Sequence, residues 1–318
     1  MLTNFLPWVE KYRPTNINNI ISHDQNIYTI KKLLEADSLP HLLFHGSPGT
    51  GKTSTIIALA SHIYGKNLRL MVMKLDASDD RGINSVREDI KEFAEKSNMF
   101  QKGVRLIILD EVDSMTFDAQ FALRRIIEKY SETIRFCLIC NYENKIIPAI
   151  RSRCANFRFS NIDNKHICQK LQQIIDIEQL NYEPNIINII AQLSKGDLRK
   201  SINLLQSISM QNEIITPELC YITAGIPTND DILYILSILS NNSIDFNNAY
   251  NSINKIINNN NYSLSFILKE IVVEIINNIT SYLPHILSEL SDLENMVSKS
   301  TFGEIYLTTF IAIFKKSN

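Results

Sequence analysis

The chain has 318 residues, 45% of them hydrophobic, and a formal net charge of −2. This length favours two or three domains with buried cores. The near-neutral charge excludes a polycation, so any nucleic-acid contact must come from a local basic patch, and with neither a membrane-length apolar run nor an export signal we expect no membrane association and no secretion.

Residues 8–14 bring aromatic, basic and proline residues together, and taken alone they indicate an anchoring segment. The next strong signal is the pattern G-x-x-x-x-G-K-[ST], between an apolar strand expected at 41–45 and a helix expected over 52–64. It is matched by Gly46, Ser47, Pro48, Gly49, Thr50, Gly51, Lys52 and Thr53, followed by Ser54. Glycine-rich backbone and a helix N-terminus bind polyphosphate, and the pattern therefore predicts an ATP or GTP site. We expect Lys52 to reach the outer phosphates and Thr53 to ligate Mg²⁺.

Strands and helices alternate from residue 42 to about residue 159. The expected strands are 41–45, 71–75, 104–109, 134–140 and 155–159, and the expected helices are 52–64, 83–97, 117–130 and 145–150. This alternation predicts an α/β fold in which a parallel sheet has helices on both faces. Ligands of such sheets bind at the carboxyl ends of the strands, where the phosphate loop lies.

Two carboxylates, Asp110 and Glu111, follow the strand 104–109. At the carboxyl edge of the sheet, Asp110 is expected to hold Mg²⁺ and Glu111 to polarise the attacking water. Asn141 ends the next strand; alone it is more often a turn residue, but an amide there can orient water near the γ-phosphate. Arg153 follows soon after, and its spacing alone fits a solvated arginine.

Five cysteines in a chain without an export signal indicate free thiols in a reducing compartment. Cys137 and Cys140 have the spacing of a zinc half-site, but they fall within a strand and no second pair follows at ligand spacing. Zinc is therefore not expected.

The rest of the chain is predicted to be helical. Asp197 is expected to cap a helix and to place Arg199 in its first turn. The apolar stripe near residues 266–276 fits either a core or a subunit interface. We predict three domains: a nucleotide-binding α/β domain over residues 1–160, a helical lid over 161–227 and an all-helical domain over 228–318.

Together, these motifs resemble the small subunits of replication factor C, the AAA+ ATPases of the sliding-clamp loader. The matching stretches are residues 7–14, 46–53, 77–83, 109–111, 122–128, 152–154 and 196–199. Residues 135–142 and 145–149 look most like the subunit type numbered five in animals and three in budding yeast.

The resemblance implies roles that spacing does not establish. Val9, Tyr12 and Arg13 would lie near the adenine and ribose of ATP. Asn141 would be the first nucleotide sensor, and Arg199 would reach the γ-phosphate from the lid as the second. Arg153 would be an arginine finger that acts in trans on the ATP of a neighbouring subunit. The C-terminal domain would be a collar that joins five subunits into a ring.

The resemblance also implies partners: the other subunits of a hetero-pentamer, a sliding clamp and primer–template DNA. Helices along the central chamber nominate DNA contacts at Arg81, Arg87, Lys91 and Lys145, for which solvated charge is an equally good interpretation. Residues 98–100 would lie near the clamp, or in the core. Location in the nucleus is expected, or a viral replication site if a large DNA virus encodes the chain.

One departure from the family is Asp76, where an asparagine is usual, because it adds a carboxylate near Glu111. Two other functions remain open from the sequence. One is a largely structural subunit that binds ATP and donates Arg153. The other is a different AAA+ machine, such as a branch-migration motor or a protein remodeller.

Overall fold

The computed structural model describes residues 6–35, 38–78, 82–95, 104–211, 214–241, 243–260, 262–278, 284–299 and 303–316. The chain divides into two compact units, Met1–Gln179 with Ser194–Gln206, and Leu180–Leu193 with Ser207–Asn318. The division into three domains at residues 160 and 227 stays a prediction.

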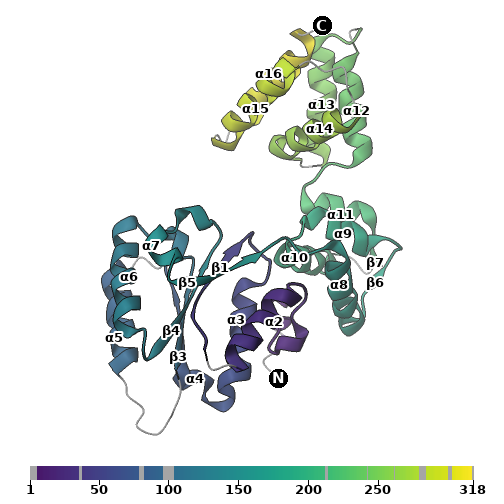
Figure 1. The fold of residues 1–318 in the computed structure, drawn as a ribbon. Helices are drawn as coiled ribbons and strands as arrows, with labels where there is room; N and C mark the ends of the chain where they lie inside the picture. Colours follow the sequence, from purple (N-terminus) through teal and green to yellow (C-terminus); the bar gives the residue numbers. More distant parts are fainter. Residues whose placement is uncertain are drawn as a thin grey trace. The chain divides into compact units, whose positions relative to one another are not determined.

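A parallel five-stranded sheet lies at the centre of the first unit, in the order β2-β3-β4-β1-β5 (Figure 1). The strands are β1 His41–Gly46, β2 Val72–Asp76, β3 Arg105–Asp110, β4 Ile134–Cys140 and β5 Cys154–Phe159. The predicted α/β class is confirmed. Each strand was predicted to within one residue at either end, because apolar runs that end in Gly, Asp or Asn are read easily from sequence.

Helices cover both faces of this sheet. On one face α2 (Asp24–Glu35) and α3 (Lys52–Tyr64) share a core with the sheet, and on the other α5 (Gly82–Glu95), α6 (Phe117–Tyr130) and α7 (Pro148–Arg151) share a second core (Figure 1). The other elements of this unit are α1 Trp8–Lys11, η2 Ile17–Asn19, η3 Gly65–Asn67, α4 Leu68–Met71, η4 Val112–Ser114, η5 Glu143–Lys145, α8 Asn164–Glu178 and α10 Leu198–Ser209, which runs on into the second unit.

The alternation of strand side chains selects which polar residues face α3. In β3, Leu106 and Ile108 are buried in the core on the α3 face, so Asp110 points to the same face. In β4, Cys137 and Ile139 are in that core, and Asn141 continues the alternation. The two polar ends of β3 and β4 therefore converge on the beginning of α3.

The same alternation separates the two cysteines of β4. Cys137 belongs to the core on the α3 face, whereas Cys140 belongs to the core under α6. The two thiols point to opposite faces of one strand and cannot hold a single ion. Burial raises the pKa of Cys140 to about 12.

The prediction of one helix over residues 145–150 was wrong. The segment divides into η5, which ends at Lys145, and α7, which begins at Pro148. Ile147 has an extended backbone with ψ of 142°. The residue before a proline is kept out of the helical region, whereas proline itself fits the first helical position.

The second unit is mainly helical. Its elements are β6 Asn181–Tyr182, α9 Ile186–Ser194, β7 Ile214–Ile215, α11 Pro217–Ala224, α12 Asn229–Ser240, α13 Phe246–Asn260, α14 Leu264–Asn278, α15 Pro284–Lys299 and α16 Gly303–Lys316. Helices α12 to α16 bury one continuous apolar core that includes Ile235, Ile271 and Phe310. Among the described residues, no helix is both long enough and apolar enough to cross a membrane.

Candidate functional site: a nucleotide cleft at the carboxyl edge of the sheet

The loop between β1 and α3 depends on glycines that accept unusual backbone angles and close contacts. Gly46, Gly49 and Gly51 have φ of 141°, 70° and 93°. A Cβ on Gly46 would lie 2.0 Å from the Phe159 carbonyl oxygen, and one on Gly49 would lie 1.7 Å from Asp197 Oδ1. The loop is therefore held against the end of β5 and the beginning of α10 at positions where only glycine fits.

Lys52 begins α3 and is buried under this loop, with 7% of its surface exposed. Its Nζ donates hydrogen bonds to the Gly46 and Ser47 carbonyls, at 2.7 and 2.8 Å, and to Asn141 Oδ1 at 2.9 Å. Burial lowers the pKa of Lys52 from its usual value. A phosphate oxygen could replace one of these three acceptors, and its negative charge would raise the pKa of the buried ammonium again.

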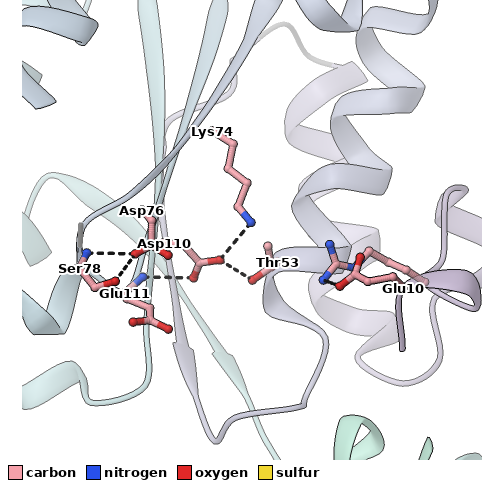
Figure 2. Close-up of polar contacts among 8 residues, drawn as sticks. Glu10, Thr53, Lys74, Asp76, Ser78, Asp110 and Glu111 are labelled. Carbon is pink, nitrogen blue, oxygen red and sulfur yellow. Dashed lines mark hydrogen bonds and ion pairs between the residues drawn. The ribbon is translucent and has the colours of Figure 1, made fainter. Parts of the chain in front are cut away.

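Thr53 and Asp110 meet beside Lys52. The Thr53 hydroxyl donates to Asp110 Oδ2 at 2.9 Å, and the Glu111 backbone N–H donates to Asp110 Oδ1 at 3.1 Å (Figure 2). Two hard oxygen donors in contact, one charged and one neutral, fit Mg²⁺, which takes few protein ligands and fills its remaining positions with water and phosphate. Lys74 Nζ also lies 3.8 Å from Asp110 Oδ2.

Glu111 follows in a backbone conformation that side-chain-bearing residues seldom adopt, with φ of 55°. Its carbonyl accepts hydrogen bonds from the Ser114 backbone and hydroxyl, which fix this turn. Asp76 directs its Oδ1 to the N–H and hydroxyl of Ser78 (Figure 2). Asp76, which departs from the family pattern, therefore forms hydrogen bonds with the residue two positions after it, at the end of β2.

A residue that the sequence did not nominate, Asp113, holds the backbone at Asn141. Its Oδ2 accepts hydrogen bonds from the backbone N–H groups of Asn141 at 3.2 Å and Tyr142 at 3.1 Å. The carboxylate therefore orients the loop after β4, while the Asn141 side chain reaches Lys52.

The segment from Val9 to Pro14 forms another wall of the cleft. Tyr12 donates its hydroxyl to Glu178 of α8, and Lys11 Nζ lies 2.6 Å from the same carboxylate. Burial and the adjacent carboxylate raise the pKa of Tyr12, so it stays a neutral donor. Arg13 pairs with Glu10 at 2.7 Å.

The beginning of α10 closes the cleft from the other side. Asp197 Oδ1 accepts the Lys200 N–H at 2.9 Å, which confirms the predicted cap, and the Leu198 N–H donates to the Gly49 carbonyl at 3.2 Å. Arg199 is in the first turn of the helix, as expected. Arg199 therefore belongs to a helix whose first residue is hydrogen-bonded to the phosphate loop, and its side chain lines the cleft.

One cleft gathers most of the predicted binding residues, and its empty space is about 840 Å³ including the open mouth. It is lined by Val9, Tyr12, Arg13, Pro14, Pro48, Gly49, Thr50, Gly51, Lys52, Thr53, Ser54, Asp110, Glu111, Asn141, Leu198, Arg199 and Ile202. Gly46 and Ser47 contribute through the carbonyls that bind Lys52. Pro14, Leu198 and Ile202 were not among the predicted binding residues, although Pro14 and Leu198 lie within the stretches 7–14 and 196–199 that carry the resemblance.

Arg153 lies elsewhere. Its Nη2 is 2.6 Å from Glu128 Oε1 of α6, and its Nη1 donates to the Ala149 carbonyl at 2.7 Å. Arg124 Nε donates to the same Glu128 oxygen at 3.0 Å. Two arginines thus lower the pKa of Glu128.

Three of the proposed DNA residues, Arg87, Lys91 and Lys145, are exposed on α5 and η5. Arg87 and Lys91 line a depression together with Arg125 and Lys129 of α6. Arg81 and residues 98–100 lie outside the residues that the structure describes.

Comparison with known proteins decides the family. Residues 42–162 match the ATPase family associated with various cellular activities (AAA), and residues 169–210 match the RCF1/5-like AAA+ ATPase lid domain. Human replication factor C subunit 5 is 44% identical over 98% of this chain and 92% of the human protein. Replication factor C subunit 3 of Saccharomyces cerevisiae is 41% identical over 98% of this chain and 94% of the yeast protein.

The chain belongs to the replication factor C subunit family. The resemblance inferred from sequence is confirmed, including the type numbered five in animals and three in budding yeast. With it comes the assignment as an ATPase subunit of a clamp loader in DNA replication. Among solved structures, the RuvB Holliday junction branch migration motor of Thermotoga maritima aligns with a TM-score of 0.52, 17% identity and coverage of 76% of this chain and 85% of RuvB. That likeness shows the AAA+ fold alone.

Proposed function

We propose that this replication factor C subunit binds ATP with Mg²⁺ in the cleft and hydrolyses it as a ring of subunits opens a sliding clamp and releases it on primer–template DNA. The cleft itself is the main support. Lys52, the Thr53–Asp110 pair and Asn141 come from three separate elements and meet within hydrogen-bond distance.

Each part of the cleft has a role in ATP binding. Val9, Tyr12 and Arg13 contact the adenine and ribose, and the amides of the loop from Gly46 to Thr53 surround the phosphates. Lys52 and Arg199 supply positive charge to the outer phosphates. The Lys52 Nζ holds two loop carbonyls and Asn141 together, so it is already positioned where a γ-phosphate would bridge lysine and sensor.

Hydrolysis needs a metal, a base and a water. Mg²⁺ held by Thr53 and Asp110 would supply charge neutralisation at the phosphates. Glu111 accepts a proton from the attacking water, and the turn fixed by Ser114 keeps its carboxylate next to Asp110. Asn141 orients the water or the γ-phosphate through its amide.

Arg153 acts on a neighbouring subunit because it is too far from its own phosphate loop. It precedes β5, whose Cys154 pairs with His41 at the beginning of β1, whereas the loop follows Gly46 at the end. Five residue steps of about 3.3 Å separate the two levels by roughly 16 Å, more than an arginine side chain spans. An arginine supplied in trans stabilises the transition-state charge.

A trans arginine requires a neighbouring subunit, and the replication factor C relatives are named as numbered subunits, so we assign the chain to a hetero-pentameric ring. The helices α12 to α16 of the second unit form its collar. Each interface then contains one subunit's ATP and the next subunit's arginine, so that ATP binding closes the ring and hydrolysis loosens it. We place this cycle in the nucleus, at replication sites.

DNA binding is assigned to the basic depression between α5 and α6. Arg87 and Lys91 face Arg125 and Lys129 across it, and the side chains that provide the charge come from two adjacent helices. Such a surface fits the phosphates of a duplex without reading its sequence. Lys145, stacked 4.9 Å from the Tyr142 ring, extends the basic surface beyond this depression.

Two other functions are less well supported. A purely structural subunit does not need a carboxylate in the position of Glu111, yet Glu111 lines the cleft beside Asp110. A branch-migration motor shares the fold at 17% identity, whereas replication factor C subunits share 41% to 44% over nearly the full chain.

Energy transfer from Trp8, the only tryptophan of the chain, to a fluorescent ATP analogue tests the nucleotide site directly. We expect Lys52→Met to weaken affinity at least tenfold, and Glu111→Gln to keep affinity while turnover is lost. The exposed Lys66→Met is the control and should match the wild type. Wild-type affinity in Lys52→Met would count against the site.

A further inference from the structure

The carboxylate assigned to Mg²⁺ already faces a cation from its own chain. Lys74 Nζ lies 3.8 Å from Asp110 Oδ2, the oxygen that accepts the Thr53 hydroxyl at 2.9 Å (Figure 2). Lys52, the other lysine of the site, donates its three hydrogen bonds to two carbonyls and to Asn141 Oδ1. Lys74 is therefore the lysine that pairs with the metal-binding carboxylate.

Strand pairing explains why Lys74 is there. It lies on β2 at the edge of the sheet, opposite Ile108 of β3, and Asp76 lies opposite Asp110. The side chains of Lys74 and Asp76 alternate with Met73 and Leu75, which pack into the core under α6, so they point to the α3 face with Asp110. The Lys74 side chain is 47% exposed, long enough to reach Asp110 and free enough to swing away.

A metal ion and an ammonium group beside one carboxylate repel each other and compete for its negative charge. When Mg²⁺ binds Asp110, Lys74 is repelled from its partner. Without Mg²⁺, Lys74 stays and offsets part of the repulsion between a polyphosphate and the carboxylates of Asp110 and Glu111. A positive charge in this position raises the affinity for nucleotide in the absence of metal. It therefore reduces the increase in affinity that Mg²⁺ produces.

We propose that Lys74 is a tethered cation that partly replaces Mg²⁺ at Asp110, so that this chain binds ATP with less dependence on Mg²⁺ than its phosphate loop alone would give. The inference rests on the proposed function of the cleft. By linkage, the ratio of the dissociation constant of ATP in EDTA to that of Mg–ATP in saturating Mg²⁺ equals the factor by which the protein strengthens the binding of Mg²⁺ to ATP. Lys74 acts to lower that ratio.

The test measures the affinity of the full-length chain for a fluorescent ATP analogue, in EDTA and in saturating Mg²⁺. Energy transfer from Trp8 to the analogue reports binding. We expect Lys74→Met to raise the ratio roughly threefold to tenfold, as for one half-exposed charge beside the metal. Most of the change should come from weaker binding in EDTA. Lys74→Arg, which keeps the charge, should stay within twofold of the wild type, and Lys66→Met is the control for a lost surface lysine.

Lys74→Gln repeats the test should Lys74→Met fold poorly by circular dichroism. An unchanged or smaller ratio in the neutral variants, while the wild type binds ATP, would overturn the role of Lys74 and leave the cleft intact. A wild type that binds no ATP in either buffer would overturn the nucleotide site and this inference with it.

Discussion

Asp113→Ala should loosen the loop that carries Asn141 without removing a side chain that lines the nucleotide cleft. One oxygen of Asp113 accepts both the Asn141 and the Tyr142 backbone N–H groups, at 3.2 and 3.1 Å. Hydrogen bonds to a charged group contribute roughly 1.5–3 kcal/mol each, but these are long and Tyr142 is exposed. We therefore expect a total loss of about 2 kcal/mol in the free energy of unfolding of the first unit.

The functional effect should fall on turnover. Asn141 that drifts by about 1 Å no longer orients the γ-phosphate, and misplacement of that size costs roughly ten- to a hundredfold in rate. The ATP dissociation constant should stay within twofold, because Asp113 is not among the residues lining the cleft. Urea unfolding followed by Trp8 fluorescence and steady-state ATP turnover measure the two effects.

Asp113→Asn is the matched comparison, since its amide oxygen can still accept both hydrogen bonds without the charge. We expect it to lose about half as much stability as Asp113→Ala. The exposed Asp292→Ala, on α15 of the second unit, controls for loss of a surface carboxylate. Unchanged stability and turnover in Asp113→Ala would refute the reasoning, and an equal loss of ATP affinity would mean that Asp113 contacts the nucleotide.

Three further predictions concern other parts of the first unit. Gly49→Ala should weaken ATP binding at least tenfold, because its Cβ would collide with Asp197; affinity near wild type in a fluorescence titration would contradict the close approach. Burial lowers the pKa of His41 from 6.5 to about 4, so at pH 5 its imidazole is protonated in the unfolded chain and neutral in the folded one. The free energy of unfolding should therefore be about 2 kcal/mol lower at pH 5 than at pH 7. The loss should be absent from His41→Asn in urea titrations at the two pH values, and its persistence there would assign it to another group. Arg153→Ala should leave this subunit's ATP affinity unchanged and slow hydrolysis in the assembled ring by at least a hundredfold at the adjoining site; a defect confined to its own site would exclude action in trans.

The sequence predicted the sheet well for a physical reason. The central strands β1, β3 and β4 are buried apolar runs, closed by Gly46 in β1 and by Asp110 in β3 and followed by Asn141 after β4, and such runs have few alternative structures. The expected helix over residues 145–150 is interrupted because Pro148 keeps the preceding Ile147 out of the helical region, so that α7 begins only at the proline.

The site was predictable where chemistry follows a fixed spacing. The phosphate loop and Asp110 belong to local patterns, and the strands bring them together whatever the rest of the chain does. Asp113 beside Asn141, Glu128 beside Arg153, and Glu178 beside Tyr12 depend on contacts 25 or more residues apart in the sequence, and no periodicity encodes them. Lys74 was missed for the same reason, since its importance arises only from pairing between β2 and β3.

ATP turnover by the chain within its native complex tests the central claim most directly. It is compared with no addition, with primed DNA, and with primed DNA plus sliding clamp, for the wild type and Glu111→Gln. We predict strong stimulation by DNA and clamp together, reduced in Glu111→Gln by the share of turnover that this subunit contributes. Stimulation that is unchanged by Glu111→Gln would contradict hydrolysis at this site, and no response of the intact complex to either ligand would contradict the clamp-loading function itself.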